Sequence, residues 1–370
     1  MKFIINAQTL QTELAFLSGV VANKSNTIPV LQNIIIASEN TSSLKISGTD
    51  LDVSLSCQTE AAVSEPGTIL VPMAKLLAIT KTLPKTADMT FQSLENGGAK
   101  LTCERASFKL MAPEFEAFPE IQEPKEGAIE IPTDIFSNMI ASTIYAITQE
   151  ESRYTLSGAK VEIDESSMRM ITTDGHRLAK SENKEITSKK TIDVLIPRKA
   201  LAELAKICSA HEGTLRFTTD PNHIYFQVGS RSLSARLLSG QFPNYEMVIP
   251  KANDNSFATD VTAFREAVRR VSLVADGRSH AIRLDIKAGQ LNFSASTPDD
   301  GEALESIPID FNGEETSIGF NSQYLLDSYN ALGHQDLVTL SFKDGNSQVM
   351  LVPGAALAKQ SLAVIMPCRL

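Results

Sequence analysis

Hydrophobic and polar positions along this chain repeat one pattern three times, at a spacing of about 124 residues. In each copy a short β-type run meets a breaker and continues as a segment whose apolar residues lie three and four apart, which is typical of an amphipathic helix. The breakers are Pro72, Pro197 and Asn321. A second phrase keeps the same register, at Phe118-Pro119, Phe242-Pro243 and Met366-Pro367. Such a repeat predicts three tandem copies of one domain. The expected domains are 1–125, 126–251 and 252–370.

The pattern predicts two helices in each copy. The first helices are expected over 7–21, 133–147 and 260–274, and the second over 73–82, 198–209 and 322–332. Strands are expected in the alternating, β-branched stretches between them, at Asn33–Ala37, Leu44–Gly48, Leu101–Leu110, Met168–Thr172, Ile224–Val228, Leu233–Leu238, Ile282–Ile286 and Leu291–Ala295. Strands outnumber helices and no long crossovers separate them, which indicates an α+β fold with antiparallel sheets.

Each predicted helix has one apolar face. In the segment 260–274, Phe264, Val268 and Val271 fall on one side of the helix. Three arginines fall on the other side, at Arg265, Arg269 and Arg270. Helices of the other two copies also carry outward basic residues, at Lys75, Lys81, Lys199 and Lys206. For a single helix this is a solvated polar face, but the recurrence in all three copies predicts one shared basic surface.

The composition as a whole is acidic. The 370 residues carry a formal net charge of −10 at pH 7, which argues against a protein that coats itself in nucleic acid but permits a single basic surface. No apolar run approaches the ~20 residues needed to cross a bilayer, and the first residues turn polar too soon for a signal peptide. The four cysteines lie far apart and the histidines show no metal spacing. We therefore expect a reduced, cytoplasmic protein with no membrane segment, metal or cofactor.

Two copies share an aspartate that follows a strand. Asp50 in the run T-D-L-D-V aligns with Asp174 in the run T-D-G-H-R. An Asp in this place usually accepts hydrogen bonds from its own turn. The turn role is favoured over a catalytic carboxylate, because the third copy has Ser296-Thr297-Pro298, which can cap a turn but cannot act as a general base. The run Gly175-His176-Arg177 has no counterpart in the other copies, and it favours a binding site in the middle domain over a merely structural histidine.

The end of the chain also departs from the repeat. The last seven residues, 364–370, are apolar where chain ends are normally polar. They are expected to form either a last core strand or the lip of a hydrophobic pocket. The sequence contains no Walker A loop, G-x-G-x-x-G, H-E-x-x-H or G-x-S-x-G motif. With three copies of one scaffold, a binding or architectural role is favoured over an enzyme.

Specific runs occur from the first residue to the last. They are the opening M-K-F, Thr27-Ile28-Pro29-Val30-Leu31, Gly48-Thr49-Asp50-Leu51, Arg153-Tyr154, Thr173-Asp174-Gly175-His176-Arg177-Leu178, Phe242-Pro243-Asn244-Tyr245, Phe320-Asn321 with Tyr324, and Met366-Pro367-Cys368-Arg369-Leu370. In these runs, and over its whole length, the chain resembles the bacterial sliding clamp family, the β subunit of the replicative DNA polymerase holoenzyme. The runs T-D-G-H-R-L and M-P-x-R-L are specific in combination.

The resemblance implies a non-catalytic processivity factor, built as three tandem clamp domains and closed into a head-to-tail homodimeric ring around duplex DNA, with the helices lining the hole. Six helices spaced ~9 Å apart leave no room for DNA, whereas twelve leave roughly 24 Å clear. A DNA duplex is roughly 20 Å wide, so only the dimer admits it. Basic side chains that hold phosphates loosely, without reading bases, let such a ring slide. By similarity, the residues expected to face DNA are Lys24, Lys75, Gln149, Arg153, Tyr154, Arg198 and Lys199.

The resemblance also implies a pocket between the middle and last domains, into which polymerases, the clamp loader and repair proteins insert a short apolar peptide. The motif-matched pocket positions are Leu156, Thr173, Gly175, His176, Arg177, Leu178, Pro243, Val248, Asn321, Tyr324, Ser347, Val364, Met366, Pro367, Arg369 and Leu370. Three residues depart from those usual in the family, namely Asn244, Met247 and Cys368. The preferred peptide is therefore expected to differ in detail.

At the seam of the dimer, the resemblance implies that Phe108 and Leu110 of one subunit meet Leu273 and Val274 of the other. Pairing of exposed strand edges across subunits would cover them. Two other interpretations remain open at this point. One is a hydrolase that uses Asp174 and His176, and the other is a monomeric repeat scaffold that never meets DNA.

Overall fold

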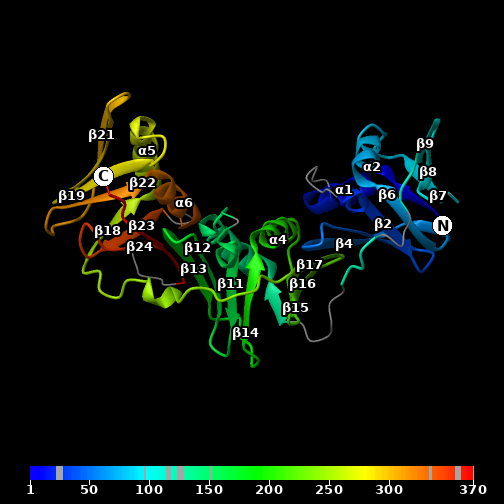
Figure 1. The fold of residues 1–370 in the computed structure, drawn as a ribbon, viewed down its shortest axis with the longest axis horizontal. Coiled ribbons are helices and arrows are strands. Elements are labelled where there is room, and N and C mark those ends of the chain that lie inside the picture. The colour runs from blue at the N-terminus through cyan, green and yellow to red at the C-terminus, as the bar shows by residue number, and fades with distance from the viewer. Residues whose placement is uncertain are drawn as a thin grey trace. The chain divides into compact units, whose positions relative to one another are not determined.

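The computed structural model describes residues 1–21, 28–95, 97–113, 118–122, 129–150, 152–332, 336–354 and 360–369 (Figure 1). The chain divides into two compact units. The first is formed by Met1–Asp134 with Ala202–Leu237, and the second by Ile135–Leu201 with Leu238–Leu370. The middle repeat therefore contributes strands to both units.

The first unit contains two antiparallel sheets. One has the order β5-β1-β7-β8-β9, with β1 at Lys2–Asn6, β5 at Ala62–Glu65, β7 at Asp88–Ser93, β8 at Ala99–Cys103 and β9 at Ala106–Leu110. The other has the order β10-β15-β16-β17-β4-β3-β2-β6, with β2 at Asn33–Ser38, β3 at Ser43–Thr49, β4 at Val53–Glu60, β6 at Gly67–Pro72, β10 at Ile129–Pro132, β15 at Thr214–Thr219, β16 at His223–Val228 and β17 at Arg231–Arg236. Because β17 pairs with β4, the first and middle repeats share one sheet.

The second unit repeats this arrangement. One sheet has the order β14-β11-β12-β13-β25-β24-β23-β18, with β11 at Gly158–Ile163, β12 at Met168–Thr173, β13 at Arg177–Asn183, β14 at Ile192–Pro197, β18 at Asn255–Asp260, β23 at Leu337–Phe342, β24 at Val349–Pro353 and β25 at Ser361–Ile365. The other has the order β21-β20-β19-β22, with β19 at Ala281–Lys287, β20 at Gln290–Thr297, β21 at Gly301–Pro308 and β22 at Thr316–Asn321. Here β13 pairs with β25, so the middle and last repeats also share a sheet.

Six α-helices lie in the described ranges, two from each repeat. They are α1 at Ala7–Val21, α2 at Met73–Thr80, α3 at Thr133–Ala141, α4 at Arg198–Ala210, α5 at Val261–Val271 and α6 at Ser322–Leu332. The three predicted breakers Pro72, Pro197 and Asn321 end the strands β6, β14 and β22 immediately before a helix. Packing joins α1 to α2 in the first unit and α5 to α6 in the second. The predicted fold of three tandem α+β copies with antiparallel sheets is confirmed.

Burial follows the predicted apolar stripes. In α5, Phe264, Val268 and Val271 are buried, and Phe264 stacks on Tyr329 of α6 with ring centres 3.8 Å apart. Each fully buried side chain of this kind stabilises the fold by roughly 1.5–3 kcal/mol. On the opposite side, Arg270 is held by Glu305 of β21 at 2.6 Å. That arginine therefore serves the fold of its own unit.

Three predicted elements are shorter than expected. The stretch 101–110 is a hairpin of β8 and β9, because Glu104 takes a positive φ of 50° and turns the chain. The helices predicted over 133–147 and 260–274 end early and are followed by single 3₁₀ turns, at Ile144–Ala146 and Ser272–Val274. None of the helices in the described part of the chain is both long and apolar enough to span a membrane.

Candidate functional site

The turn between β12 and β13 is held by its own side chains. Thr173 Oγ1 donates to the carbonyl of Arg177 at 2.7 Å, and the N–H groups of His176 and Arg177 each donate to Asp174 Oδ1 at 3.0 Å. Gly175 takes a φ of 87°, in the left-handed region that glycine adopts readily. The prediction that Asp174 serves its own turn is therefore confirmed.

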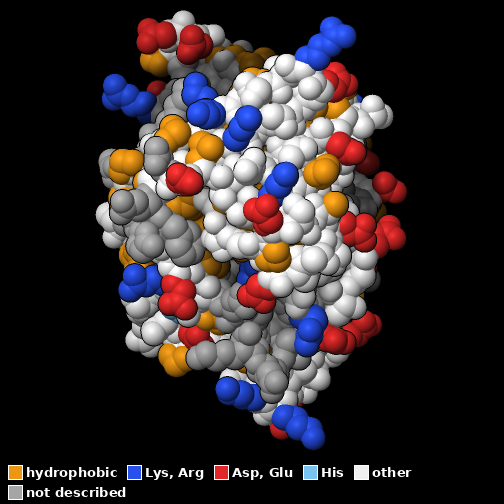
Figure 2. Space-filling model, turned by 90° about the vertical axis from the view of Figure 1, so that its right-hand side faces the viewer, with side chains coloured by type: hydrophobic (Ala, Val, Ile, Leu, Met, Phe, Trp, Pro, Cys, Tyr) orange, Lys and Arg blue, Asp and Glu red, His pale blue; other side chains and the backbone are white. Residues whose placement is uncertain are grey.

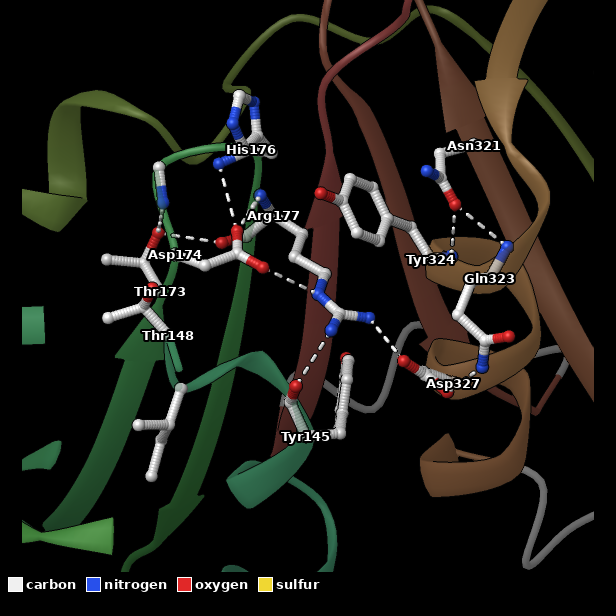
Figure 3. Close-up of polar contacts among 12 residues, drawn as sticks. Tyr145, Thr148, Thr173, Asp174, His176, Arg177, Asn321, Gln323, Tyr324 and Asp327 are labelled. Atoms are coloured by element: carbon white, nitrogen blue, oxygen red, sulfur yellow. Dashed lines mark hydrogen bonds and ion pairs between the residues drawn. The ribbon is translucent and has the colours of Figure 1, made fainter. Parts of the chain in front are cut away.

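Arg177 connects this turn to α6. Its Nε donates to Asp174 Oδ2 at 2.9 Å, its Nη1 to Asp327 Oδ2 at 2.6 Å, and its Nη2 to the Tyr145 carbonyl at 2.9 Å (Figure 3). The guanidinium carbon also lies 4.5 Å from the ring centre of Tyr324 and 5.2 Å from that of Tyr145, within cation–π range. Burial disfavours the charged guanidinium, but Asp327 and Asp174 outweigh this, so the pKa of Arg177 lies above its ordinary value. A single side chain thus joins the middle and last repeats.

An apolar cluster lies beside the turn. Leu178 of β13 and Val364 of β25 are cross-strand partners. The buried members of the cluster are Ile171, Leu178, Leu195, Phe242, Tyr245, Val352, Leu362 and Val364, and the partly buried ones are Leu156, Leu238, Val248, Ile249 and Met350. Four predicted pocket positions, Leu156, Leu178, Val248 and Val364, therefore come together in the structure. This cluster is separate from the main core of the last repeat.

The end of the chain passes along the same turn. The N–H of Met366 donates to the His176 carbonyl at 2.9 Å, and the N–H of Cys368 donates to the Gly319 carbonyl at 2.9 Å. Met366 is 38% exposed just beyond β25. The His176 ring stacks on Tyr324, with ring centres 6.2 Å apart. The interpretation of the apolar end as a core strand is confirmed by β25, and the residues after β25 pass beside the His176 turn.

The segment 242–249 is fixed over the cluster by one tyrosine. Tyr245 is buried, and its hydroxyl donates to Glu162 Oε2 at 2.8 Å. Burial, and then the Glu162 carboxylate, raise the pKa of the Tyr245 phenol. Glu162 also forms an ion pair with Arg169, whose Nε lies 3.3 Å from Glu162 Oε2. This contact positions Phe242 and Val248, the two cluster members on either side of Tyr245 in the sequence.

Replacing Tyr245 by phenylalanine is expected to lower the melting temperature. A hydrogen bond to a charged group contributes about 1.5–3 kcal/mol, and 1 kcal/mol corresponds to about 2–4 °C in a domain of this size. Calorimetry should therefore show a fall of roughly 5 °C. Tyr154→Phe is the matched control, because Tyr154 is exposed and should leave the melting temperature unchanged. Equal melting temperatures for Tyr245→Phe and the unmodified protein would show that the hydroxyl does not hold this segment.

The remaining predicted pocket residues differ in their surroundings. Asn321 ends β22 immediately before α6, and its Oδ1 accepts from the N–H groups of Gln323 and Tyr324 at 2.9 and 3.3 Å. Pro243 is exposed next to buried Phe242. Ser347 donates its N–H and hydroxyl to Asp344 Oδ1, and both contacts lie within the turn before β24. Pro367 is half-buried and Arg369 exposed, and Leu370 lies outside the described residues.

Two residues of the site were missed by sequence reasoning, Tyr145 and Asp327. Asp327 lies 150 residues from Arg177 and contacts it only through the fold. The one available signal was its spacing, since Asp327 follows Tyr324 by three residues and so shares its helix face. Tyr145 follows α3, and its backbone carbonyl accepts a hydrogen bond from Arg177. A pattern of side chains cannot reveal a contact made by the backbone.

The residues predicted to face DNA differ in their surroundings. Arg153 donates to the Asp174 carbonyl at 2.6 Å and pairs with Glu150 at 3.0 Å, so its guanidinium lies at the His176 turn. Arg198 donates to the Ile147 carbonyl at 2.9 Å. Lys75, Gln149 and Tyr154 are exposed, Lys199 is half-buried, and Lys24 lies outside the described residues.

The predicted dimer residues lie at or beside sheet edges. Phe108 and Leu110 belong to β9, the last strand of its sheet, and Leu273 and Val274 form the 3₁₀ turn after α5. Leu273 is 82% exposed, and Leu304 on the edge strand β21 is 78% exposed. Figure 2 views the molecule from the side of β9, where hydrophobic side chains lie among basic and acidic ones. Leu304 was missed by sequence reasoning because alternation along a strand does not show which strand ends a sheet.

Within the described residues, no group of three or more His, Cys, Asp or Glu side chains is arranged to hold a metal ion. Cys57, Cys103 and Cys208 are buried free thiols, and Cys368 is half-buried. Asp174 is fully engaged by its own turn and by Arg177, which leaves His176 without the carboxylate partner that the hydrolase interpretation required.

Comparisons with known proteins agree over the whole chain. Family models of the DNA polymerase III beta subunit match residues 1–122 with the N-terminal domain, 130–244 with the central domain and 246–369 with the C-terminal domain. The beta sliding clamp of Pseudomonas putida is 33% identical over all of both chains, and that of Haemophilus influenzae is 31% identical over 90% of each. The crystal structure of the DNA polymerase III subunit beta from Pseudomonas aeruginosa has a TM-score of 0.94 at 31% identity, with full coverage of both chains. A sliding clamp from Bartonella birtlesii, solved bound to griselimycin, has a TM-score of 0.94 at 29% identity, again with full coverage.

Three tandem α+β repeats that share sheets at both junctions, with an apolar site at the second junction, define a three-domain DNA clamp. The chain belongs to the beta sliding clamp family, the beta subunit of DNA polymerase III. It is a non-catalytic processivity factor that acts as a dimeric ring on duplex DNA and docks polymerase and other clamp-binding proteins. The hydrolase and the monomeric scaffold are therefore excluded as its function.

Proposed function

We propose that the second junction is the partner-docking pocket and that its floor is the apolar cluster around Leu178 and Val364. The observation that supports this most strongly is Arg177, whose three donors tie the His176 turn to α6 and so fix two walls of one site. An apolar floor bordered by a few oriented polar groups suits a short peptide with apolar anchors. The pocket residues are those predicted by the resemblance, together with Tyr145, Arg153 and Asp327.

Griselimycin is proposed to bind in this pocket. Two relatives have been solved bound to it, from Pseudomonas aeruginosa and Bartonella birtlesii. We refer to griselimycin carrying a fluorophore as the pocket probe. Fluorescence anisotropy of the pocket probe then measures occupancy of the second junction without any polymerase present.

Replacing His176 by alanine is expected to lower the affinity for the pocket probe at least tenfold while the dimer stays intact. The substitution removes the ring that stacks on Tyr324 and leaves the backbone of the turn in place. His223→Ala is the matched control. That histidine also follows an Asp-capped turn and lies 6.3 Å from a tyrosine ring, but it belongs to the first unit. Equal affinities of the pocket probe for both variants would rule out His176 as a pocket residue.

The DNA-facing set is also a proposal. The exposed or half-buried residues Lys75, Gln149, Tyr154 and Lys199 are proposed to contact DNA phosphates loosely. Such contact needs positive charge or hydrogen-bond donors, and it makes no contact with the bases. Lys24 belongs to the same proposal on sequence alone. Arg153 and Arg198 already donate to backbone carbonyls, so their guanidinium groups have to be shared between the fold and DNA. The protein is proposed to work in the cytoplasm, with clamp domains at 1–125, 126–251 and 252–370.

Pairing of β9 in one subunit with β21 in another is proposed to close the ring. Both strands end their sheets and leave backbone N–H and C=O groups without a neighbouring strand on one side. Phe108 and Leu110 on β9, and Leu273, Val274 and Leu304 beside or on β21, supply the apolar surface that such a seam would bury.

A further inference from the structure

The two junctions between repeats carry the same turn. At the first junction, Thr49 Oγ1 donates to the Val53 carbonyl at 3.1 Å, as Thr173 Oγ1 does to Arg177 at 2.7 Å. Leu51 N–H donates to Thr49 Oγ1 at 3.1 Å, as Gly175 N–H does to Thr173 Oγ1 at 3.1 Å. Even the left-handed backbone is shared, since Leu51 takes a φ of 82° and Gly175 one of 87°. Leu51 holds this conformation without being glycine, so the surrounding turn imposes it.

The aspartates act alike as well. Asp50 Oδ1 accepts from the N–H groups of Asp52 and Val53 at 3.1 and 2.8 Å. This matches Asp174, whose Oδ1 accepts from the two corresponding N–H groups at 3.0 Å. The backbone of the two turns is therefore the same design, hydrogen bond for hydrogen bond.

The strand that crosses beside each turn also corresponds. The N–H of Arg236 donates to the Asp52 carbonyl at 2.9 Å, as the N–H of Met366 donates to the His176 carbonyl at 2.9 Å. Arg236 therefore occupies the place of Met366. Two residues further along each strand, Ser54 pairs with Ser234 where Leu178 pairs with Val364. These pairings give three corresponding positions: Ser54 and Leu178, Ser234 and Val364, and Arg236 and Met366.

Side-chain chemistry separates the two junctions. At the first junction two adjoining hollows of about 200 and 280 Å³ share Ser54, Gln122 and Ser234 in their walls. Pro119, which aligns with Pro243 in the repeat, lines the smaller hollow. The first junction is therefore hollowed at the positions where it carries the polar residues Ser54 and Ser234. At the second junction, Leu178 and Val364 instead fill the floor as buried apolar residues.

We propose that these three positions determine which junction accepts an apolar partner peptide, and that the first junction is a peptide groove of the same build closed to apolar peptides by Ser54, Ser234 and Arg236. The inference rests on the proposed function of the second junction. The Ser54 hydroxyl at the first junction already donates to Thr49 Oγ1 at 2.8 Å. An apolar anchor there would therefore remove water mainly from the Ser234 hydroxyl and the Arg236 guanidinium, and would return no hydrogen bond to either group. At the second junction the same anchor would displace water from the exposed Met366 side chain, beside a floor of buried Leu178 and Val364 that carries no polar side-chain group.

The test is a count of binding sites. The variant Ser54→Leu, Ser234→Val, Arg236→Met gives the first junction the three residues of the second. Titration of the pocket probe at a protein concentration well above its dissociation constant should show one site per chain in the unmodified protein and two in this variant. The variant that also carries Leu178→Ser, Val364→Ser and Met366→Arg should return to one site, now at the first junction.

A single exposed substitution keeps the test independent of folding. Met366→Arg alone should lower the affinity for the pocket probe at least tenfold. Its circular dichroism spectrum should match that of the unmodified protein. A folded triple variant that still binds one probe per chain would overturn the inference while leaving the proposed pocket standing. An unmodified protein that binds no probe would overturn the proposed pocket itself. Unchanged affinity in Met366→Arg would also count against the inference.

Discussion

Arg177→Ala is expected to lower the melting temperature by about 10 °C and to abolish binding of the pocket probe. The side chain is 10% exposed and pairs with carboxylates of both the middle and the last repeat. Removal of one partner from a buried ion pair costs about 3–5 kcal/mol, because the remaining carboxylates keep their charge without compensation. Each 1 kcal/mol corresponds to about 2–4 °C in a domain of this size. The probe is lost because the turn and α6 no longer share a fixed side chain.

Two controls make this result specific. Arg177→Lys keeps the charge but loses the forked geometry that reaches Asp174, Asp327 and the Tyr145 carbonyl together. Its melting temperature should therefore lie between those of the alanine variant and the unmodified protein. Arg283→Ala removes an arginine whose pair with Asp285 is half exposed, and it should change the melting temperature by no more than about 2 °C. If Arg177→Ala and Arg283→Ala melted alike, the buried contacts of Arg177 would contribute nothing to stability.

The double variant Leu273→Asp, Leu304→Asp is expected to be monomeric at micromolar concentration. Both leucines are almost fully exposed in one chain, and burial of each at a subunit seam would contribute roughly 1.5–3 kcal/mol. Loss of both, with two carboxylates placed in the seam, should raise the dimer dissociation constant at least about 100-fold. Sedimentation should then report a species of 40.2 kDa instead of one twice that mass.

Met247→Asp provides the matched control for the seam. Met247 is 81% exposed, much like the two leucines, but it lies in the 3₁₀ turn of the segment over the pocket. This variant should remain dimeric. A dimeric double variant, or dissociation by Met247→Asp to the same degree, would contradict the assignment of the seam to β21 and the turn after α5.

Much of the fold was predictable because local chemistry and the repeat agreed. Proline or asparagine at the start of α2, α4 and α6 ends a strand and begins a helix whatever the tertiary context. Asp50 and Asp174 could be assigned to their turns because an aspartate bonds to N–H groups two and three residues ahead. Glu104 was missed, because a positive φ at glutamate has no signal in the pattern of polar and apolar residues.

The site was only partly predictable, and for a physical reason. The sequence singled out the His176 turn and the apolar chain end as departures from the repeat. Residue spacing could not show that both adjoin one cluster, since the pairing of β13 with β25 joins segments about 186 residues apart. Only the family resemblance placed them in one pocket. Residue spacing also did not show that the guanidinium of Arg153 donates to the Asp174 carbonyl. Long, flexible side chains choose partners from the fold, and sequence spacing does not reveal them.

The comparison of the two junctions adds a second lesson. The repeat preserved the backbone of both turns down to their individual hydrogen bonds, while the side chains on the neighbouring strands diverged between serine and leucine or valine. A shared scaffold can therefore carry a site at one junction and not at the other.

The central claim, a ring that encircles DNA without gripping it, is tested most directly by retention on DNA of different topology. The protein is loaded onto a nicked circular plasmid with its clamp loader and ATP, half of the sample is cut once with a restriction enzyme, and both halves are separated by gel filtration. The protein should remain with the circle and leave the linear DNA through its ends. Equal retention on circular and linear DNA, or none on the circle, would contradict the claim.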